Sequence, residues 1–572
     1  MLFHTWPFLI FMLIVLPGYF ALRKTPMWIP WLLAASYFFY AWWNPYYLLL
    51  VVYSTALDYL LVTLMDHCPP AGAIAQDDLA RKGESDSVGS APRTAIPDVE
   101  ATVRGADPTA QVHSGPSQPP AYRTDRLLQV SFIISTLLSV ALIGGAIFAP
   151  EQYRLRATFI AFATIVGLMA FGARAASRRV WLFISLFNNL ALLVFFKYAR
   201  FVEQNLNQVL SAFHFDWHFP DPSKLMPHGW EYVLPVGISF FTFQSMSYTI
   251  DFYFGKVQRE RNILRFATFV CFFPQLMAGP IERARQMLPQ LQKAPPFAVE
   301  NITDGMSLFL VGLFKKLALA NYLGLYVDRI YENPANASAT SLVFATVGFA
   351  WQIFFDFSGY TDMARGVAKM MGFNLVLNFN NPYLATGLAD FWSRWHISLS
   401  TWFRDYVYIP LGGNRRGMLA TYRNLFITFV VSGIWHGANW TFAIWGALHA
   451  VGIMLTRELE RGAFYRDRVP VFVKRAWVFV YVCFAWIFFR ASSLSDAMVV
   501  VTRIFSAAWN SVQMPALLLA LILSVWLYQM IYESRWRELL RFSPVRVALA
   551  AGMILFIGVC STGGKAFIYF QF

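Results

Sequence analysis

Apolar runs of about 20 residues recur along this sequence, and a run of that length can cross a lipid bilayer as a helix. Of the 572 residues, 57% are apolar and 14% are charged, whereas about a quarter of the residues of a soluble domain are charged. Lipid offers no hydrogen-bond partners to the backbone, so an all-α, polytopic membrane protein is expected, and a soluble enzyme is excluded. The N-terminal runs are 6–22, 27–43, 46–65, 127–149, 157–173 and 180–196.

The formal net charge of +14 comes largely from Lys and Arg in short loops beside the apolar runs. Such loops set the orientation of a membrane protein, so the charge indicates topology and contact with the bilayer, not binding to nucleic acid. Arg23 and Lys24 follow the first run, and further arginines follow the fifth, which predicts an N-terminus outside the cytoplasm. The four cysteines are far apart and match neither a zinc site nor a disulfide framework, so no metal is expected.

Four regions are predicted along the chain. Residues 1–65 form the N-terminal transmembrane helices, and residues 66–126 lack Phe and Trp, which predicts a disordered cytoplasmic loop. Residues 127–175 form an additional transmembrane hairpin, and residues 176–572 form the membrane core with the C-terminal helices. Several apolar runs of the core are too short to span, so we expect buried or re-entrant helices around a central polar cavity.

Polar residues of this core collect between residues 356 and 449. The run 390–406 predicts one amphipathic, interfacial or re-entrant helix, with His396 on its apolar face. His396 is then either a hydrogen-bonded packing residue or part of a site. The glycine turn at 412–413 and the basic residues after it, Arg415 and Arg416, either end this element at the cytoplasmic surface or bind the phosphates of a donor.

A second histidine, His436, lies between two apolar stretches and is flanked by Gly433 and Gly437. An ionisable residue at membrane depth is costly and is by default a functional candidate. The imidazole pKa lies near neutrality, so His436 suits removal of a proton from a hydroxyl. The alternative is a structural histidine bonded to a backbone carbonyl, and we prefer that interpretation for His449.

Five sequence blocks resemble the membrane-bound O-acyltransferase superfamily, in particular its bacterial, alginate-acetylating branch. They are PVGISFFTFQ at 235–244, FPQLMAGPI at 273–281, DFSGYTD at 356–362, RWHISLS at 394–400 and WHGANW at 435–440. The resemblance implies a helical body whose tunnel leads to His436, with His396 as the second histidine of the site. The segment 66–175 departs from that pattern, and its role is open.

The resemblance also implies the chemistry. An acetyl group would pass from a cytoplasmic thioester, acetyl-CoA, to an exopolysaccharide or to an extracytoplasmic acetyltransferase partner, at the bacterial inner membrane and with no bound cofactor. His436 would act as general base or proton relay, and His396 would orient the thioester. The substrate-binding residues would be Arg404, Trp435, Asn439, Trp395 and Ser400.

Three other functions remain open. Transfer of D-alanyl groups to a teichoic-acid-type polymer is the nearest, because that class shares the histidine blocks. A polysaccharide or small-molecule transporter would carry ionisable residues along several spans, whereas here they gather in one segment. A non-catalytic scaffold would tolerate loss of both histidines.

Overall fold

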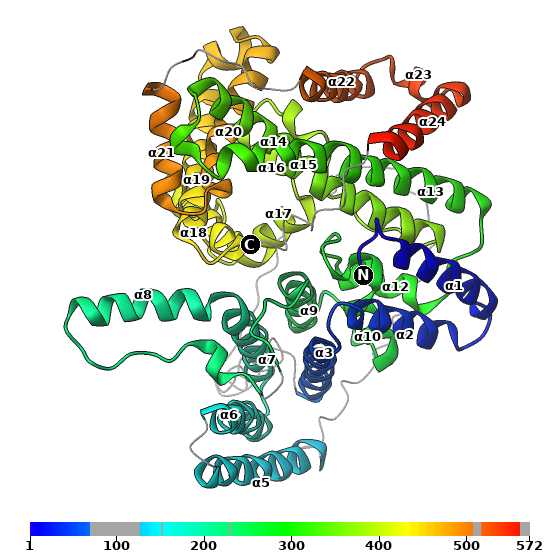
Figure 1. Cartoon of the computed structure of the whole chain (residues 1–572). Coiled ribbons are helices and arrows are strands. Elements are labelled where there is room, and N and C mark those ends of the chain that lie inside the picture. Colours follow the sequence, from blue (N-terminus) through cyan, green and yellow to red (C-terminus); the bar gives the residue numbers. More distant parts are fainter. Residues whose placement is uncertain (69–125, 150–152, 228–229, 507–508, 510–515, 561–572) are drawn as a thin grey trace, which may run out of the picture. The chain divides into compact units, whose positions relative to one another are not determined.

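The computed structural model describes residues 1–68, 126–149, 153–227, 230–506, 509 and 516–560. Every regular element in these ranges is helical, which confirms the predicted all-α fold (Figure 1). Eight of the described helices are long and apolar enough to cross a membrane. The chain is therefore a multi-pass membrane protein.

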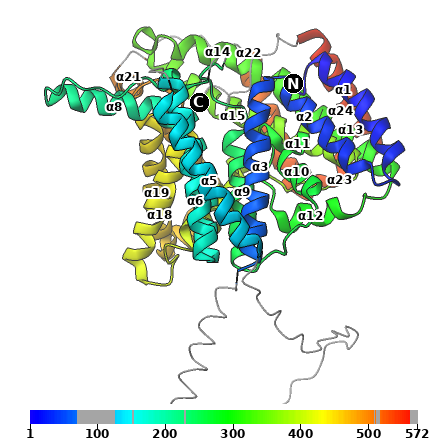
Figure 2. The ribbon, with the colours of Figure 1, turned by 90° about the horizontal axis from the view of Figure 1, so that it is seen from below.

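The chain divides into two compact units, residues 1–59, 188–248 and 260–572 in the first and residues 60–187 and 249–259 in the second. In the second unit, α5 (Arg126–Phe148) and α6 (Tyr153–Ala175) lie side by side (Figure 2). These helices contain the two apolar runs of the predicted hairpin. Most of the predicted loop 66–126 lies outside the described residues.

The helices differ in how much protein surrounds them. The most apolar part of α5 is only 6% buried, whereas that of α15 (Ala339–Met370) is 78% buried. Apolar side chains that protein does not cover are those that lipid can solvate. By this measure α15 is an inner helix of the first unit, and protein leaves most of the surface of α5 uncovered.

Glycines bring the helices of the first unit close together. A Cβ atom on Gly305 of α13 (Val299–Phe314) would lie 2.6 Å from the carbonyl oxygen of Gly366 in α15. A Cβ on Gly433 of α18 (Gly417–His436) would lie 2.2 Å from the carbonyl oxygen of Phe442 in α19 (Trp440–Arg461). Such contacts are how membrane helices associate without a hydrophobic driving force.

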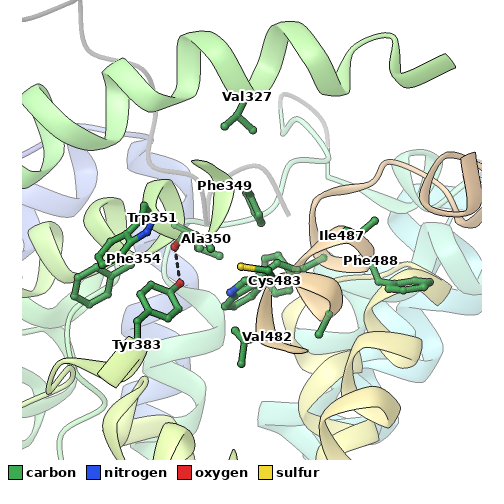
Figure 3. Packing of buried hydrophobic residues seen from close by; sticks show 14 of the residues in the cluster. Val327, Phe349, Ala350, Trp351, Phe354, Tyr383, Val482, Cys483, Ile487 and Phe488 are labelled. Carbon is green, nitrogen blue, oxygen red and sulfur yellow. Dashed lines mark hydrogen bonds between the residues drawn. The ribbon is translucent and has the colours of Figure 1, made fainter. Parts of the chain in front are cut away.

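A cluster of buried aromatic and aliphatic side chains joins α15 to α20 (Val471–Arg490) and to the segment around Tyr383 (Figure 3). The Tyr383 hydroxyl donates a hydrogen bond to the carbonyl oxygen of Ala350, 2.5 Å away. Trp395 belongs to the same cluster and is 1% exposed. The cluster therefore fixes the backbone directly before His396.

The expectation of one helix over 390–406 is wrong. The segment forms α16 (Leu388–Arg394) and α17 (Ile397–Phe403), and then a π-helical turn, η6 (Arg404–Tyr408). His396 separates the two helices with a φ of 43°, in the left-handed region that non-glycine residues rarely adopt. Long-range hydrogen bonds stabilise this break, as described below.

The short buried helices expected in the core are present, and α11 is buried at all four positions. The remaining elements have the following bounds: α1 Trp6–Leu22, α2 Trp28–Ala41, α3 Pro45–Asp66, α7 Arg178–Leu193, η1 Val194–Tyr198, α8 Ala199–Ala212, η2 Pro222–Leu225, α9 Ile238–Tyr253, α10 Ile263–Cys271, α11 Phe273–Leu276, α12 Ala284–Gln292, η3 Lys315–Ala320, α14 Asn321–Tyr331, η4 Pro334–Asn336, η5 Pro382–Leu384, η7 Phe464–Arg468, α21 Leu494–Ser506, α22 Ala516–Glu533, α23 Arg537–Arg541 and α24 Ser543–Cys560.

Candidate active site

His396 is fully buried, and its imidazole is held by Asn378. The Nδ1 atom of His396 lies 3.1 Å from the Oδ1 atom of Asn378. The same oxygen accepts hydrogen bonds from the backbone N–H of Ser398 at 3.2 Å and from its hydroxyl at 2.9 Å. The backbone N–H of Ile397 donates to the carbonyl oxygen of Asn378 at 2.9 Å. Asn378 therefore stabilises the break between α16 and α17.

This geometry assigns the tautomer of His396. An amide oxygen only accepts, so the hydrogen of the neutral imidazole lies on Nδ1, and the lone pair lies on Nε2. Nε2 is buried and has no hydrogen-bond partner among the described residues. The ring is also fixed by Phe357, whose ring centroid lies 4.6 Å away in an edge-to-face arrangement. His396 thus presents a pre-oriented acceptor to the interior.

His436 is the last residue of α18 and is 3% exposed. Its ring packs against Trp435 at 4.9 Å, Trp445 at 5.0 Å and Phe489 at 5.4 Å, measured between centroids. The ring of His396 lies 6.4 Å from that of Trp435. The tertiary structure therefore gathers both predicted histidines around Trp435.

His449 has the geometry of a packing residue. It is fully buried in α19, and its Nδ1 atom accepts a hydrogen bond from the indole N–H of Trp392 at 3.3 Å. Its ring lies 4.8 Å from that of Trp445. These contacts agree with the structural interpretation of His449.

Two cavities follow one another along α18. The smaller, of about 40 Å³, touches His436 and Trp435. The larger, of about 490 Å³, is lined by α18 between Leu425 and Ser432. With a rise of 1.5 Å per residue, the stretch from Leu425 to His436 spans roughly 16 Å. The two cavities thus border different stretches of the same helix, and the smaller one touches His436.

Two of the predicted substrate-binding residues line the larger cavity, Ser400 and Arg404. The guanidinium of Arg404 bonds to the carboxylate of Asp405 at 2.8 Å and is 60% exposed. Arg457 and Glu460 of α19 line the same cavity. The cavity therefore combines two cations and one carboxylate with apolar walls.

Of the other three predicted substrate-binding residues, Trp435 lines the smaller cavity, and Trp395 and Asn439 line neither cavity. Trp395 packs in the buried cluster, where its ring lies 5.2 Å from that of Trp486. Asn439 caps α19, because its Oδ1 atom accepts a hydrogen bond from the backbone N–H of Thr441 at 3.1 Å. Both residues therefore make structural contacts in this fold, and their role in substrate binding stays a prediction.

Glu282 is a buried carboxyl group in the loop after α11, near the Asn378 segment. One of its oxygens accepts a hydrogen bond from the backbone N–H of Val376 at 2.7 Å. Burial raises the pKa of Glu282 to about 7, against the opposing effects of this bond and of Arg365. The Glu282 carboxyl therefore takes up its proton at a much higher pH than a solvent-exposed glutamate does.

Sequence reasoning missed three polar residues of the site. Asn378 and Arg457 stand in no motif, and their roles follow only from contacts with distant segments. Lys197 had a signal, a lone cation at the end of the apolar run 180–196. Among the described residues, no group of His, Cys, Asp and Glu has the arrangement of a metal site.

Residues 256–495 match the family model for MBOAT, the membrane-bound O-acyltransferase family. The chain is 35% identical over 429 residues to the "Probable alginate O-acetylase AlgI" of Azotobacter vinelandii, an alignment that covers 73% of this chain and 81% of that protein. The chain belongs to the membrane-bound O-acyltransferase family. It is an O-acyltransferase of the membrane, and the buried histidines lie in, or next to, the sequence blocks that carried the resemblance.

Two further relatives of this O-acyltransferase have names of the same kind. The protein of the same name from Pseudomonas putida is 39% identical over 339 residues, which cover 59% of this chain and 67% of that one. The "Peptidoglycan O-acetyltransferase" of Helicobacter pylori is 35% identical over 350 residues, which cover 56% of this chain and 64% of that protein. Each of these relatives is named for acetylating a bacterial polymer.

Proposed function

We propose that this protein moves an acetyl group from a cytoplasmic thioester, acetyl-CoA, towards the hydroxyl groups of an extracytoplasmic polysaccharide in a bacterial inner membrane. The acceptor is an exopolysaccharide of the alginate type, reached directly or through an extracytoplasmic acetyltransferase partner. The observation that carries the proposal is the pair of cavities along α18, one with arginines and one at His436. The names of the relatives support acetyl as the acyl group.

The larger cavity suits the donor. Its volume of about 490 Å³ lies in the range of small-molecule sites, and it combines Arg404 and Arg457 with apolar walls. Arginine binds phosphate well because its planar fork donates parallel hydrogen bonds. The loop that carries Arg415 and Arg416 precedes α18, and positive-inside logic puts such a loop in the cytoplasm, where coenzyme A is found.

The histidines suit proton transfer and alignment. His436 acts as general base for the acceptor hydroxyl, a contribution that is typically 10²- to 10⁴-fold. His396, fixed by Asn378, aligns the thioester through its Nε2 side. Aligning the two reactants in a dry cavity lowers the remaining barrier.

The test is acetyl transfer from radiolabelled acetyl-CoA in membrane vesicles of the native host, which retain the acceptor and any partner. His436→Ala should lower the rate at least 100-fold, and His396→Ala should lower it severely, both with wild-type protein levels. The matched control is His214→Ala, because His214 is an exposed histidine that lines neither cavity.

Two results would contradict the proposal. Wild-type transfer by His436→Ala would remove the catalytic role of the histidine and favour a scaffold. Transfer of D-alanine from a carrier protein, with none from acetyl-CoA, would assign the enzyme to teichoic-acid-type modification instead.

A further inference from the structure

Lys197 stands where an apolar helix meets the candidate active site. It belongs to the π-helical turn η1, within a helical stretch, Arg178–Ala212, that is long and apolar enough to cross a membrane. Its ammonium donates a hydrogen bond to the carbonyl oxygen of His436 at 2.9 Å and lies 5.5 Å from the centroid of the Trp435 ring. A lysine at membrane depth is costly, and π-turns within helices are frequent at functional sites.

Lys197 and His436 line the same small cavity. Residues 234–240 form most of its wall, and among the described lining residues Lys197 is the one Lys or Arg side chain. The volume of about 40 Å³ is enough for a water molecule or a group of similar size. A reacting oxygen placed in this small cavity is therefore close to both Lys197 and His436.

We propose that the Lys197 ammonium stabilises the negative charge that develops on the acyl carbonyl oxygen during transfer at His436. This inference rests on the proposed function. Fixed donors aimed at a developing oxyanion are usually the largest electrostatic contribution to acyl transfer. The bond to the His436 carbonyl fixes the ammonium beside the base before the substrate arrives.

The chemical step balances as follows. The acceptor hydroxyl oxygen forms a bond to the thioester carbonyl carbon while its proton moves to His436. The electron pair of the carbonyl bond moves to the carbonyl oxygen, where Lys197 holds it. The carbonyl bond then forms again, the carbon–sulfur bond breaks with its pair on sulfur, and the thiolate takes the proton from His436.

The simpler alternative is that Lys197 only caps α18. The last carbonyl oxygens of a helix lack internal partners, and a cation near them is favourable. Tyr198, the next residue, caps α18 without a charge, because its hydroxyl donates a hydrogen bond to the carbonyl oxygen of Ile434 at 2.9 Å. Tyr198→Phe therefore removes a cap of the same helix end while it keeps the ammonium.

Arg200 supplies the second control. It is exposed, lies 3.8 Å from the carboxylate of Asp221 and does not line the cavity at His436. Arg200→Met removes a positive charge three residues after Lys197 without touching the cavity. It separates a local effect of the Lys197 ammonium from a general effect of charge in this helical stretch.

The experiment measures kcat and KM for acetyl-CoA in vesicles that carry the full chain, together with the thermal midpoint of each purified variant. Lys197→Met should lower kcat about 10²- to 10³-fold, as loss of an oxyanion donor does, with KM within twofold of wild type. Its thermal midpoint should match that of Tyr198→Phe. Tyr198→Phe and Arg200→Met should keep kcat within threefold of wild type.

Two results would overturn the inference. One is a kcat of Lys197→Met within threefold of wild type, measured while His436→Ala is inactive. The other is an equal loss of kcat in Lys197→Met and Tyr198→Phe, which would reduce Lys197 to a helix cap. A fully active His436→Ala variant would instead contradict the proposed function itself.

Discussion

Replacing Asn378 by Ala should both destabilise the protein and disable His396. The Oδ1 atom of Asn378 is the acceptor for His396 Nδ1 and for the N–H and hydroxyl of Ser398, and the residue is fully buried. The substitution therefore leaves three buried donors without that acceptor. Each buried donor without an acceptor costs about 1–3 kcal/mol of stability. Because the surrounding structure can partly relax, we expect the free energy of unfolding to fall by about 3–5 kcal/mol.

The activity of Asn378→Ala should fall at least tenfold, because the Nδ1 hydrogen of His396 then has no fixed acceptor and the ring can rotate. Ser398→Ala provides a graded comparison, since it removes one of the three bonds to Oδ1 and the hydroxyl that accepts from Ile281 N–H. Its destabilisation should be about 1–3 kcal/mol. Asn336→Ala, at an exposed asparagine, should match wild type.

The assay is a thermal melt of each purified variant in detergent, paired with the rate of acetyl transfer in vesicles. A double-mutant cycle of Asn378→Ala and His396→Ala measures the interaction free energy between the two residues, which should be about 0.5–3 kcal/mol for groups in direct contact. A melting midpoint of Asn378→Ala within 2 °C of wild type, with an unchanged rate, would refute the reasoning. Additive effects in the cycle would show that Asn378 does not act through His396.

Three further predictions concern other parts of the site. The pKa of Glu282 is raised to about 7 from 4.5, so the stability that its protonated carboxyl provides is lost as pH rises through 7. In thermal melts, the free energy of unfolding of Glu282→Gln should therefore exceed that of wild type by about 3 kcal/mol at pH 8, but not at pH 4. Arg404→Gln should raise the half-saturation concentration of acetyl-CoA about three- to tenfold with normal insertion, whereas Arg415→Gln, outside the cavity, should leave it unchanged. Unchanged kinetics in Arg404→Gln would return the residue to a structural role. Gly433→Ala should lower the free energy of unfolding by about 3 kcal/mol, because the added Cβ would lie 2.2 Å from a backbone oxygen of α19. The control Gly552→Ala, with open space around the glycine, should melt like wild type. Equal melting midpoints of the two variants would contradict the close contact at Gly433.

The fold class was predictable because the bilayer leaves so few alternatives. A long apolar run in lipid must satisfy its own backbone, so the runs 6–22, 46–65 and 127–149 had to be helical. The family was predictable for a different reason, since blocks such as 394–400 and 435–440 keep their order and spacing. His396 and His436 were found from those blocks and from the cost of an imidazole at membrane depth.

The break at His396 was not predictable from the local sequence. The pattern of 390–406 fits one amphipathic helix, and helical periodicity contains no information about a partner outside it. The left-handed backbone of His396 forms because Asn378 offers a carbonyl oxygen and a side-chain oxygen to Ile397, His396 and Ser398. That compensation comes from a neighbouring segment, so only the folded chain shows it.

The sequence by itself thus determined the membrane helices and the histidine blocks, because both depend on local composition and spacing. The tertiary structure decided which groups surround the histidines. Lys197 meets the carbonyl of His436 across 239 positions of sequence, and Arg404 meets Arg457 only at the wall of a shared cavity. Such contacts depend on helix packing through glycines and buried aromatic rings, a property of the whole fold that no single segment contains.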